Sequence, residues 1–439
     1  MTAVSYHPMW WAREVAGVKS DAAAIDKADG PLAFAAVVAF TCILIVAPQN
    51  WIPALKPLRI AFLSASFATA SLVWEQWRNR KTPGLTGEIA ICFAILAWAF
   101  ATVPLSYWPG GSVSVLTDVY IKSVVVFWLL VNVVTTKHRL RFLAILLMLC
   151  SLPLAITGVY NSVTGKFVHD TDTISRIVGY GDALTGNPND LALMINLLLP
   201  LSIAVFLSAK GKSVRMLALI VIVADIFGVV VTFSRAGFLG LATVATAYFF
   251  QMVKRRGADR AWAFTILLSA LIAFPLLPSN YVERVATVTS VESDTTGSSQ
   301  IRWRDSVAAV HFVMQHPIIG AGIGMDWLAL NQVRGEKWYK VHNVYLQYAV
   351  DLGLPGFLLF LLLLFSVLAA VRASRRRLAS LKHDRDLFLL VQALEISIMV
   401  FVICGVFYPA AYHFYFYYIG GLGLAASTIT HRTLTVAPS

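Results

Sequence analysis

His342 and Asn343 stand at the end of a polar stretch and just before a long apolar segment. Two arginines, Arg302 and Arg304, precede them, and a Gly-Leu-Pro-Gly sequence follows at 353–356. An imidazole can take a proton from a hydroxyl group near neutral pH, and arginine binds anionic oxygens through a fixed fork of donors. This combination predicts chemistry on an anionic, lipid-linked substrate at a membrane surface.

Arg235 is a further candidate, because it lies in a very short connection between two apolar segments. A guanidinium held between helices can grip a phosphate, although an arginine can also reach the membrane interface without a substrate. Arg302 and Arg304 point in different directions on a helix. Only one of them is therefore expected to face a site, and the other to be paired locally or solvated.

The composition predicts an all-α integral membrane protein. The chain of 439 residues is 58% hydrophobic and 13% charged, which is too apolar for a soluble protein of this length. Apolar segments long enough to cross a membrane number about twelve. They lie at 31–48, 57–75, 88–105, 113–135, 140–160, 189–209, 215–233, 236–253, 262–279, 354–372, 387–407 and 411–429.

The net charge of +12 does not indicate nucleic-acid binding, because the basic residues gather in every second connection between apolar segments. Cytoplasmic loops carry such an excess of lysine and arginine. Both termini are therefore expected in the cytoplasm, and His342 on the opposite face of the membrane. No cleavable signal segment is expected before the first span. The four cysteines lie within apolar spans and predict neither a disulfide framework nor a metal site.

The chain is expected to form a single polytopic membrane domain, 1–439, with one large external loop inserted at 280–341. Residues 301–315 of this loop are expected to form a short helix that Pro317 ends. The glycines of 320–324 predict a tight turn, since no strand precedes them as a nucleotide-binding loop would require.

The same loop carries basic side chains that include Arg284 and Lys340. Such a surface can attract anionic lipid head groups without specific contacts, and solvation is the alternative for each side chain. Asn187, far earlier in the chain, precedes a proline at the expected start of an apolar helix.

Four charged residues, Asp118, Lys122, Asp225 and Glu395, fall within the expected spans. A bare charge is costly there, so they are expected to face inward and to be paired. Asp118 and Lys122 can pair with each other one helical turn apart. A proton-coupled transporter would use such residues, which keeps a second class of function open.

His342-Asn343, nine further residues and 353–356 together resemble the His-Asn/Ser/Gln-x9-Gly-x-x-Gly pattern of the O-antigen ligase family of bacterial envelope glycosyltransferases. Ser-Arg-Ala-Gly at 234–237 is similar to a Ser-Arg-Gly-like turn of that family. Arg302, followed by His-Pro-Ile-Ile-Gly-Ala-Gly at 316–322, is similar to its Arg…His-Pro-x-x-Gly-x-Gly segment. Gly-Asn-Pro-Asn at 186–189 resembles a helix start in the family. The resemblance covers residues 180–370.

The resemblance implies transfer of a preassembled O-antigen glycan from undecaprenyl diphosphate to a sugar hydroxyl of lipid A-core oligosaccharide. The reaction would take place on the periplasmic face of the bacterial inner membrane, among membrane lipids and without nucleic acid, metal or cofactor. Arg235 and Arg302 would bind the diphosphate, and His342 would orient or deprotonate the acceptor hydroxyl, which gives inversion. The expected substrate-binding residues are Arg304, Arg284, Asn343, Lys340 and Asn187.

The same pattern occurs in relatives with other acceptors. O-antigen polymerases and protein O-oligosaccharyltransferases use the same kind of donor, so both remain alternatives. A polytopic transporter or flippase is the alternative from a different class. The two classes predict different sensitive residues, which are at the loop and rim for a transferase and in the middle of the membrane for a transporter.

Overall fold

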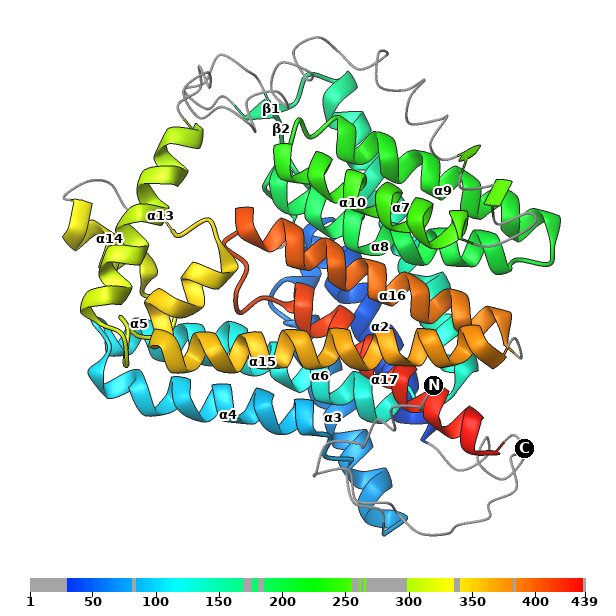
Figure 1. Cartoon of the computed structure of the whole chain (residues 1–439), viewed down its shortest axis with the longest axis horizontal. Helices are drawn as coiled ribbons and strands as arrows, with labels where there is room; N and C mark the ends of the chain where they lie inside the picture. Colours follow the sequence, from blue (N-terminus) through cyan, green and yellow to red (C-terminus); the bar gives the residue numbers. More distant parts are fainter. Residues whose placement is uncertain are drawn as a thin grey trace, which may run out of the picture.

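The computed structural model describes residues 30–80, 84–168, 176–180, 185–254, 260–261, 264–265, 298–334, 340–381 and 384–436. These residues are mainly helical (Figure 1). The helices up to residue 163 are α2 (Pro31–Val46), α3 (Ile60–Arg78), α4 (Gly87–Thr102), α5 (Pro109–Val115), α6 (Ile121–Val133) and α7 (Lys137–Val163). A π-helical turn, Leu116–Tyr120, joins α5 to α6.

The later helices begin after a small hairpin, in which β1 (Phe167–Val168) pairs antiparallel with β2 (Arg176–Ile177). They are α8 (Pro188–Ser208), α9 (Lys212–Val230), α10 (Arg235–Val253), α13 (Ser298–Gln315), α14 (Asp326–Arg334), α15 (Val344–Leu381), α16 (Arg385–Cys404) and α17 (Phe414–Val436). Single 3-10 turns lie at Pro48–Asn50, Pro53–Leu55, Val103–Leu105 and Gly405–Phe407.

The prediction of an all-α membrane protein is confirmed. By length and composition, eight helices among the described residues can cross a membrane, and they coincide with eight of the expected spans. Three further spans, expected at 31–48, 57–75 and 411–429, are helical as α2, α3 and α17. The span expected at 262–279 lies mostly outside the described residues. The count of twelve therefore stays a prediction.

The centre of the molecule is formed by α8 and α16, which pack against each other and are almost wholly buried. Ser397 of α16 donates a hydrogen bond of 2.8 Å to the carbonyl oxygen of Leu197 in α8. α15 runs alongside α16, and α5, α13 and α14 gather at one end of the bundle (Figure 1). The described part of the expected external loop therefore lies at one end of the helix bundle.

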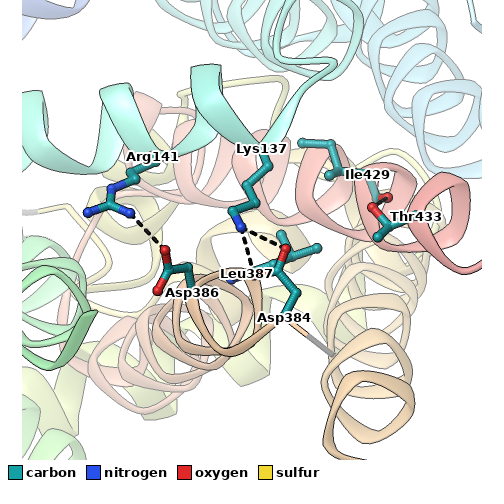
Figure 2. Close-up of polar contacts among 7 residues, drawn as sticks. All are labelled: Lys137, Arg141, Asp384, Asp386, Leu387, Ile429 and Thr433. Atoms are coloured by element: carbon teal, nitrogen blue, oxygen red, sulfur yellow. Dashed lines mark hydrogen bonds and ion pairs between the residues drawn. The ribbon is translucent and has the colours of Figure 1, made fainter. Parts of the chain in front are cut away.

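Ion pairs fasten the opposite end of the bundle (Figure 2). Lys137 Nζ lies 2.7 Å from Asp384 Oδ2, and Arg141 Nη1 lies 2.8 Å from Asp386 Oδ2. Asp384 also caps α16, because its Oδ1 accepts from the backbone N–H of Leu387 at 3.1 Å. These contacts join the start of α7 to the start of α16.

Both ends of the described chain lie at this same end of the bundle. Arg139, between the two cations of α7, donates to the carbonyl oxygen of Gly30 at 3.2 Å. Near the end of α17, the His431 ring lies 2.7 Å from Arg377 of α15. The two ends therefore lie on the same side, as an even number of membrane crossings would require.

The expectation that Asp118 and Lys122 face inward is wrong. Their side chains are 68% and 41% exposed, and they pair with each other at 3.7 Å. Asp118 lies in the π-helical turn, on the outside of the bundle. Because the pair neutralises itself one helical turn apart, it needs no partner in the interior.

The other two charges do face inward. Glu395 is 2% exposed and forms ion pairs with Arg372, at 3.1 Å, and with Arg375. Asp225 is fully buried and accepts a hydrogen bond of 3.0 Å from Ser151. The pairing expected for Glu395 is thus confirmed, while Asp225 is held by a hydroxyl group.

The span expected at 354–372 begins too late. α15 begins at Val344, and Gly353 interrupts it with a φ of 65° and a ψ of −174°. The apolar run after Gly353 predicts a helix, but residues 344–352, which mix polar and apolar side chains, are also helical. The helix expected at 301–315 is confirmed as α13, which begins three residues earlier at Ser298.

Candidate functional site

His342 lies immediately before the N-terminus of α15. Asn343 caps this helix, because its Oδ1 accepts from the backbone N–H groups of Tyr345, at 2.9 Å, and Leu346, at 3.1 Å. The cap fixes the direction in which the chain enters the helix and so fixes His342. The His342 side chain is half-buried, and its buried Nδ1 atom has no hydrogen-bond partner among the described residues.

The surroundings of His342 favour the neutral imidazole. Burial, followed by the positive charge of Arg302, lowers the pKa of His342 to about 4. The charge of Lys340 acts in the same direction, while a hydrogen bond to the Lys340 backbone partly opposes it. At neutral pH this ring is unprotonated and can accept a proton.

Arg302, rather than Arg304, is the arginine of α13 that faces His342. Arg302 is half-buried, and its charge acts on both His342 and Tyr408. Arg304 is exposed, two residues further along the helix. The different directions expected for the two side chains are thus observed.

Arg235 is the first residue of α10. Ser234 caps this helix by accepting from the backbone N–H of Gly237 at 3.1 Å. Arg235 then reaches across to α13, where its Nη1 donates to Ser299 Oγ. Ser299 precedes Arg302 by one helical turn, so this contact ties the start of α10 to the part of α13 that carries Arg302.

A third arginine, Arg176, joins the cluster from β2. Its Nη2 donates to Asn189 Oδ1 at 2.7 Å, and Ser234 donates to the same oxygen at 2.8 Å. Tyr408 donates to the Asn189 backbone oxygen at 2.7 Å. Asn189, in the first turn of α8, therefore links three segments. These are β2 with Arg176, the start of α10 with Ser234, and the connection before α17 with Tyr408.

Lys340 and His413 complete the cluster. The charge of Lys340 acts on the half-buried His413 ring as well as on His342. The charges of Lys340 and Arg176 both act on Asp190. Arg302 and Lys340 act on His342, and Lys340 and Arg176 act on Asp190, so three cations lie around these two residues and can attract an anionic ligand.

Two buried carboxyl groups hold the loops beneath the cluster. Asp326 accepts from the backbone N–H of Val341, next to His342, at 2.7 Å, and Asp351 accepts from that of Gly324 at 2.9 Å. Asp326 lies outside the apolar spans, and burial raises the pKa of its carboxyl group. These contacts fasten the 320–324 turn and the His342 segment to each other.

The tight turn predicted at 320–324 is confirmed. Gly320, Gly322 and Gly324 all have positive φ, between 72° and 95°. The backbone N–H of Gly322 donates to the Asp351 carbonyl oxygen at 2.8 Å. Close approach continues at Gly353, where a Cβ atom would overlap the backbone of Ile318. The two glycine motifs are thus packed against each other and shape the floor of the site.

The remaining expected residues are placed as follows. Asn187 is exposed and caps α8, with its Oδ1 accepting from the Asn189 N–H at 2.8 Å. Arg284 lies outside the described residues. Arg176, Asp190, Tyr408 and His413 were not found from the sequence. Nothing in local spacing marks them, because they meet the other residues only through contacts distant along the chain.

Comparison with protein families gives one match. Residues 217–361 match the family model of O-antigen ligases, a segment that contains Arg235, Arg302, His342 and both glycine motifs. Comparison with curated proteins gave no match. Members of this family carry out glycosyl transfer of the ligase or polymerase type in membranes. The matched segment is about a third of the chain, and within the helical membrane fold it is similar to O-antigen ligases.

Proposed function

We propose that the protein transfers O-antigen glycan from undecaprenyl diphosphate to a sugar hydroxyl of lipid A-core oligosaccharide. The observation that carries this proposal is the neutral imidazole of His342 next to the charges of Arg302 and Lys340. A proton acceptor and an anion receptor thus lie side by side. Transfer from a diphosphate carrier to a hydroxyl group needs both.

The acceptor hydroxyl oxygen attacks the anomeric carbon of the glycan, and the bond from that carbon to the diphosphate oxygen breaks. His342 takes the hydroxyl proton, and the electron pair of the broken bond leaves with undecaprenyl diphosphate. Direct displacement inverts the configuration at the anomeric carbon. Arg302 and Arg235 stabilise the negative charge that develops on the leaving group.

Substrate binding would itself strengthen the base. Because Arg302 and Lys340 lower the pKa of His342, a bound diphosphate between them would offset their charge and raise that pKa again. A base with a pKa nearer neutrality accepts a proton more effectively. The arrangement therefore couples donor binding to activation of the acceptor.

Arginine side chains supply the positive charge that a divalent ion supplies in other phosphate-transfer sites. We propose that the reaction requires no added metal, and a strict magnesium requirement would contradict this. The cluster is assigned to the periplasmic face of the inner membrane, with both termini in the cytoplasm and the whole chain as one membrane domain. Asn343, Lys340, Asn187 and Arg284 are assigned to substrate binding, whereas Arg304, which is exposed and faces away from His342, is left out of this set.

The test uses the purified full chain with undecaprenyl diphosphate-linked O-antigen and lipid A-core, without nucleotide. A ladder of glycan-bearing lipid A-core is the expected product. His342→Ala and Arg302→Ala should each lower the rate by about a hundredfold or more. Arg304→Ala, the matched change on the exposed side of α13, should stay near the wild-type rate. Elongated donor with unchanged core would instead indicate a polymerase.

A further inference from the structure

A groove of ≈ 1170 Å³ runs between α2, α3 and α6 on the outside of the bundle. Its lining is largely apolar and includes Phe40 of α2 and Val125 of α6. On the α3 side, the lining residues Phe62, Trp74 and Trp77 are all more than half exposed. The groove is therefore open along α3, and an apolar surface of this size marks a place where another apolar molecule binds.

The charged residues in the lining are predominantly basic. Lys56, Arg59 and Lys122 line the groove together with a single acid, Asp118. Asp118 is already paired with Lys122, which leaves the charges of two cations in excess. Gln49 also lines the groove, and its buried Oε1 atom has no hydrogen-bond partner among the described residues. Apolar walls with a basic end and a spare amide suit a lipid with a phosphate head group.

Segments next to the basic end of the groove contact segments next to the candidate site. In the connection that leads to Lys56, Trp51 donates to the Tyr180 hydroxyl oxygen at 2.9 Å. The Tyr180 backbone N–H in turn donates to Thr185, just before α8 and its Asn189, at 2.8 Å. On the other wall, the lining residue Phe414 directly follows His413, which the Lys340 charge affects. The connection before Lys56 and the start of α17 thus link the lining of the groove to segments that carry residues of the cluster around His342.

The length of the groove matches a chain that spans the hydrocarbon layer. Its lining extends along α3 from Arg59 to Trp77. At ~1.5 Å per helical residue this distance is about 27 Å, close to the hydrocarbon thickness of roughly 30 Å. A long isoprenoid chain can therefore lie along α3 while its head group stays at the basic end.

We propose that this groove is a docking surface for the isoprenoid chain of a polyprenyl diphosphate lipid, with the diphosphate at Lys56, Arg59 and Lys122. The inference rests on the proposed function, because the lipid in the groove would be the glycan donor that then passes to Arg302. Docking here concentrates the donor beside the site. Damage to the groove should therefore raise the KM for donor and leave kcat unchanged.

The first test measures binding of undecaprenyl phosphate to the full chain in phosphatidylcholine nanodiscs. The double variant Lys56→Gln/Arg59→Gln should bind it about tenfold to thirtyfold more weakly, because each cation near a membrane surface contributes modestly to attraction of the head group. Arg78→Gln, at the other end of α3 and outside the lining, is the matched control and should bind normally. Equal binding by both variants would overturn the proposal.

A second pair of variants tests the apolar wall. Ala65→Trp places a large ring inside the groove, whereas Leu63→Trp adds one on the same helix outside the lining. Only Ala65→Trp should weaken binding and raise the KM for a long-chain donor, with the KM for a farnesyl-linked donor unchanged. If Ala65→Trp displaces phosphatidylglycerol but not undecaprenyl phosphate, the occupant is a bilayer phospholipid and the proposal fails.

The groove and the catalytic proposal can fail separately. Arg302→Ala should abolish transfer. It should keep the part of undecaprenyl phosphate binding that Ala65→Trp removes. Binding that disappears in Arg302→Ala and persists in Ala65→Trp would refute the groove while leaving the proposed site intact. Groove-dependent binding in a protein that shows no transfer would refute the proposed function instead.

Discussion

His342 is kept neutral by burial and by two cations that also suit a diphosphate. In the proposed reaction, the same charges that lower the pKa of its ring also bind the leaving diphosphate. His311 of α13, in contrast, is exposed, whereas His342 is half-buried. The environment of the ring, more than its identity, makes it a candidate base.

The pH dependence of kcat/KM should report this environment. In the free protein the pKa of His342 is lowered to about 4, so activity should be level above about pH 5 and fall as the ring gains a proton below it. Lys340→Met removes one cation and should raise this pKa, which moves the acid limb to higher pH. Arg304→Met, which removes an exposed cation, should leave the limb in place. Identical limbs in all three proteins would contradict the charge coupling.

Single residues also show what the sequence could and could not predict. Arg235 stands out locally because it is an arginine in a very short connection between two apolar spans, and His342 and Arg302 stand out by the motifs around them. The structure connects the three residues. Arg176 and Tyr408 do not stand out, because a surface arginine and an interfacial tyrosine look alike in any sequence. Their role emerges only where both contact Asn189.

At the scale of elements, the break in α15 decides how the site is built. The helix turns at Gly353, and the backbone N–H of Leu354 donates to the carbonyl oxygen of Pro317 at 2.7 Å. The loop after α13 is thereby locked against the helix that starts at His342. Apolar periodicity predicted both helices but not this contact, since periodicity reports which residues are buried and not which loop crosses which helix.

Gly353→Ala should therefore damage both stability and transfer. Gly353 has a φ of 65°, and an added Cβ would overlap the backbone of Ile318. Non-glycine residues in such a conformation cost about 1–2 kcal/mol before any overlap. Gly211→Ala is the control, because nothing lies within 4 Å of an added Cβ there. Thermal unfolding and transfer rate are measured together, and an unchanged Gly353→Ala protein would show that the kink is dispensable.

The error over Asp118 and Lys122 belongs to this scale as well. An apolar window shows that a helix crosses the membrane region, but it does not show which side of the helix is covered. Here the π-helical turn keeps both charges outside, where they line the groove along α3. The four charged residues that a transporter would use are thus not gathered in one place. Asp118 and Lys122 lie on the outside, whereas Asp225 and Glu395 are buried in α9 and α16.

For the molecule as a whole, the buried charges serve cohesion. Glu395 of α16 bridges to Arg372 and Arg375 of α15, at the end of the bundle opposite His342. The paired helices carry the residues of the site at their other ends. Glu395, one of the charges expected to serve a transporter, therefore holds α15 and α16 together in this fold.

Glu395→Gln should lower the melting temperature and leave the transfer rate per folded molecule near the wild-type value. Loss of one partner of a buried pair costs up to about 3–5 kcal/mol, and the partial exposure of Arg372 reduces this figure. Asp386→Asn, which breaks the more exposed pair with Arg141, should cost no more than ~1 kcal/mol. A Glu395→Gln protein that is stable but inactive would favour the transporter class.

The candidate site collects side chains from Arg176 to His413, which lie more than 200 residues apart along the chain. A ribosome adds residues in chain order, so the arginines of the cluster are made well before Tyr408 and His413. A chain that stops before Tyr408 holds the arginines without the complete cluster.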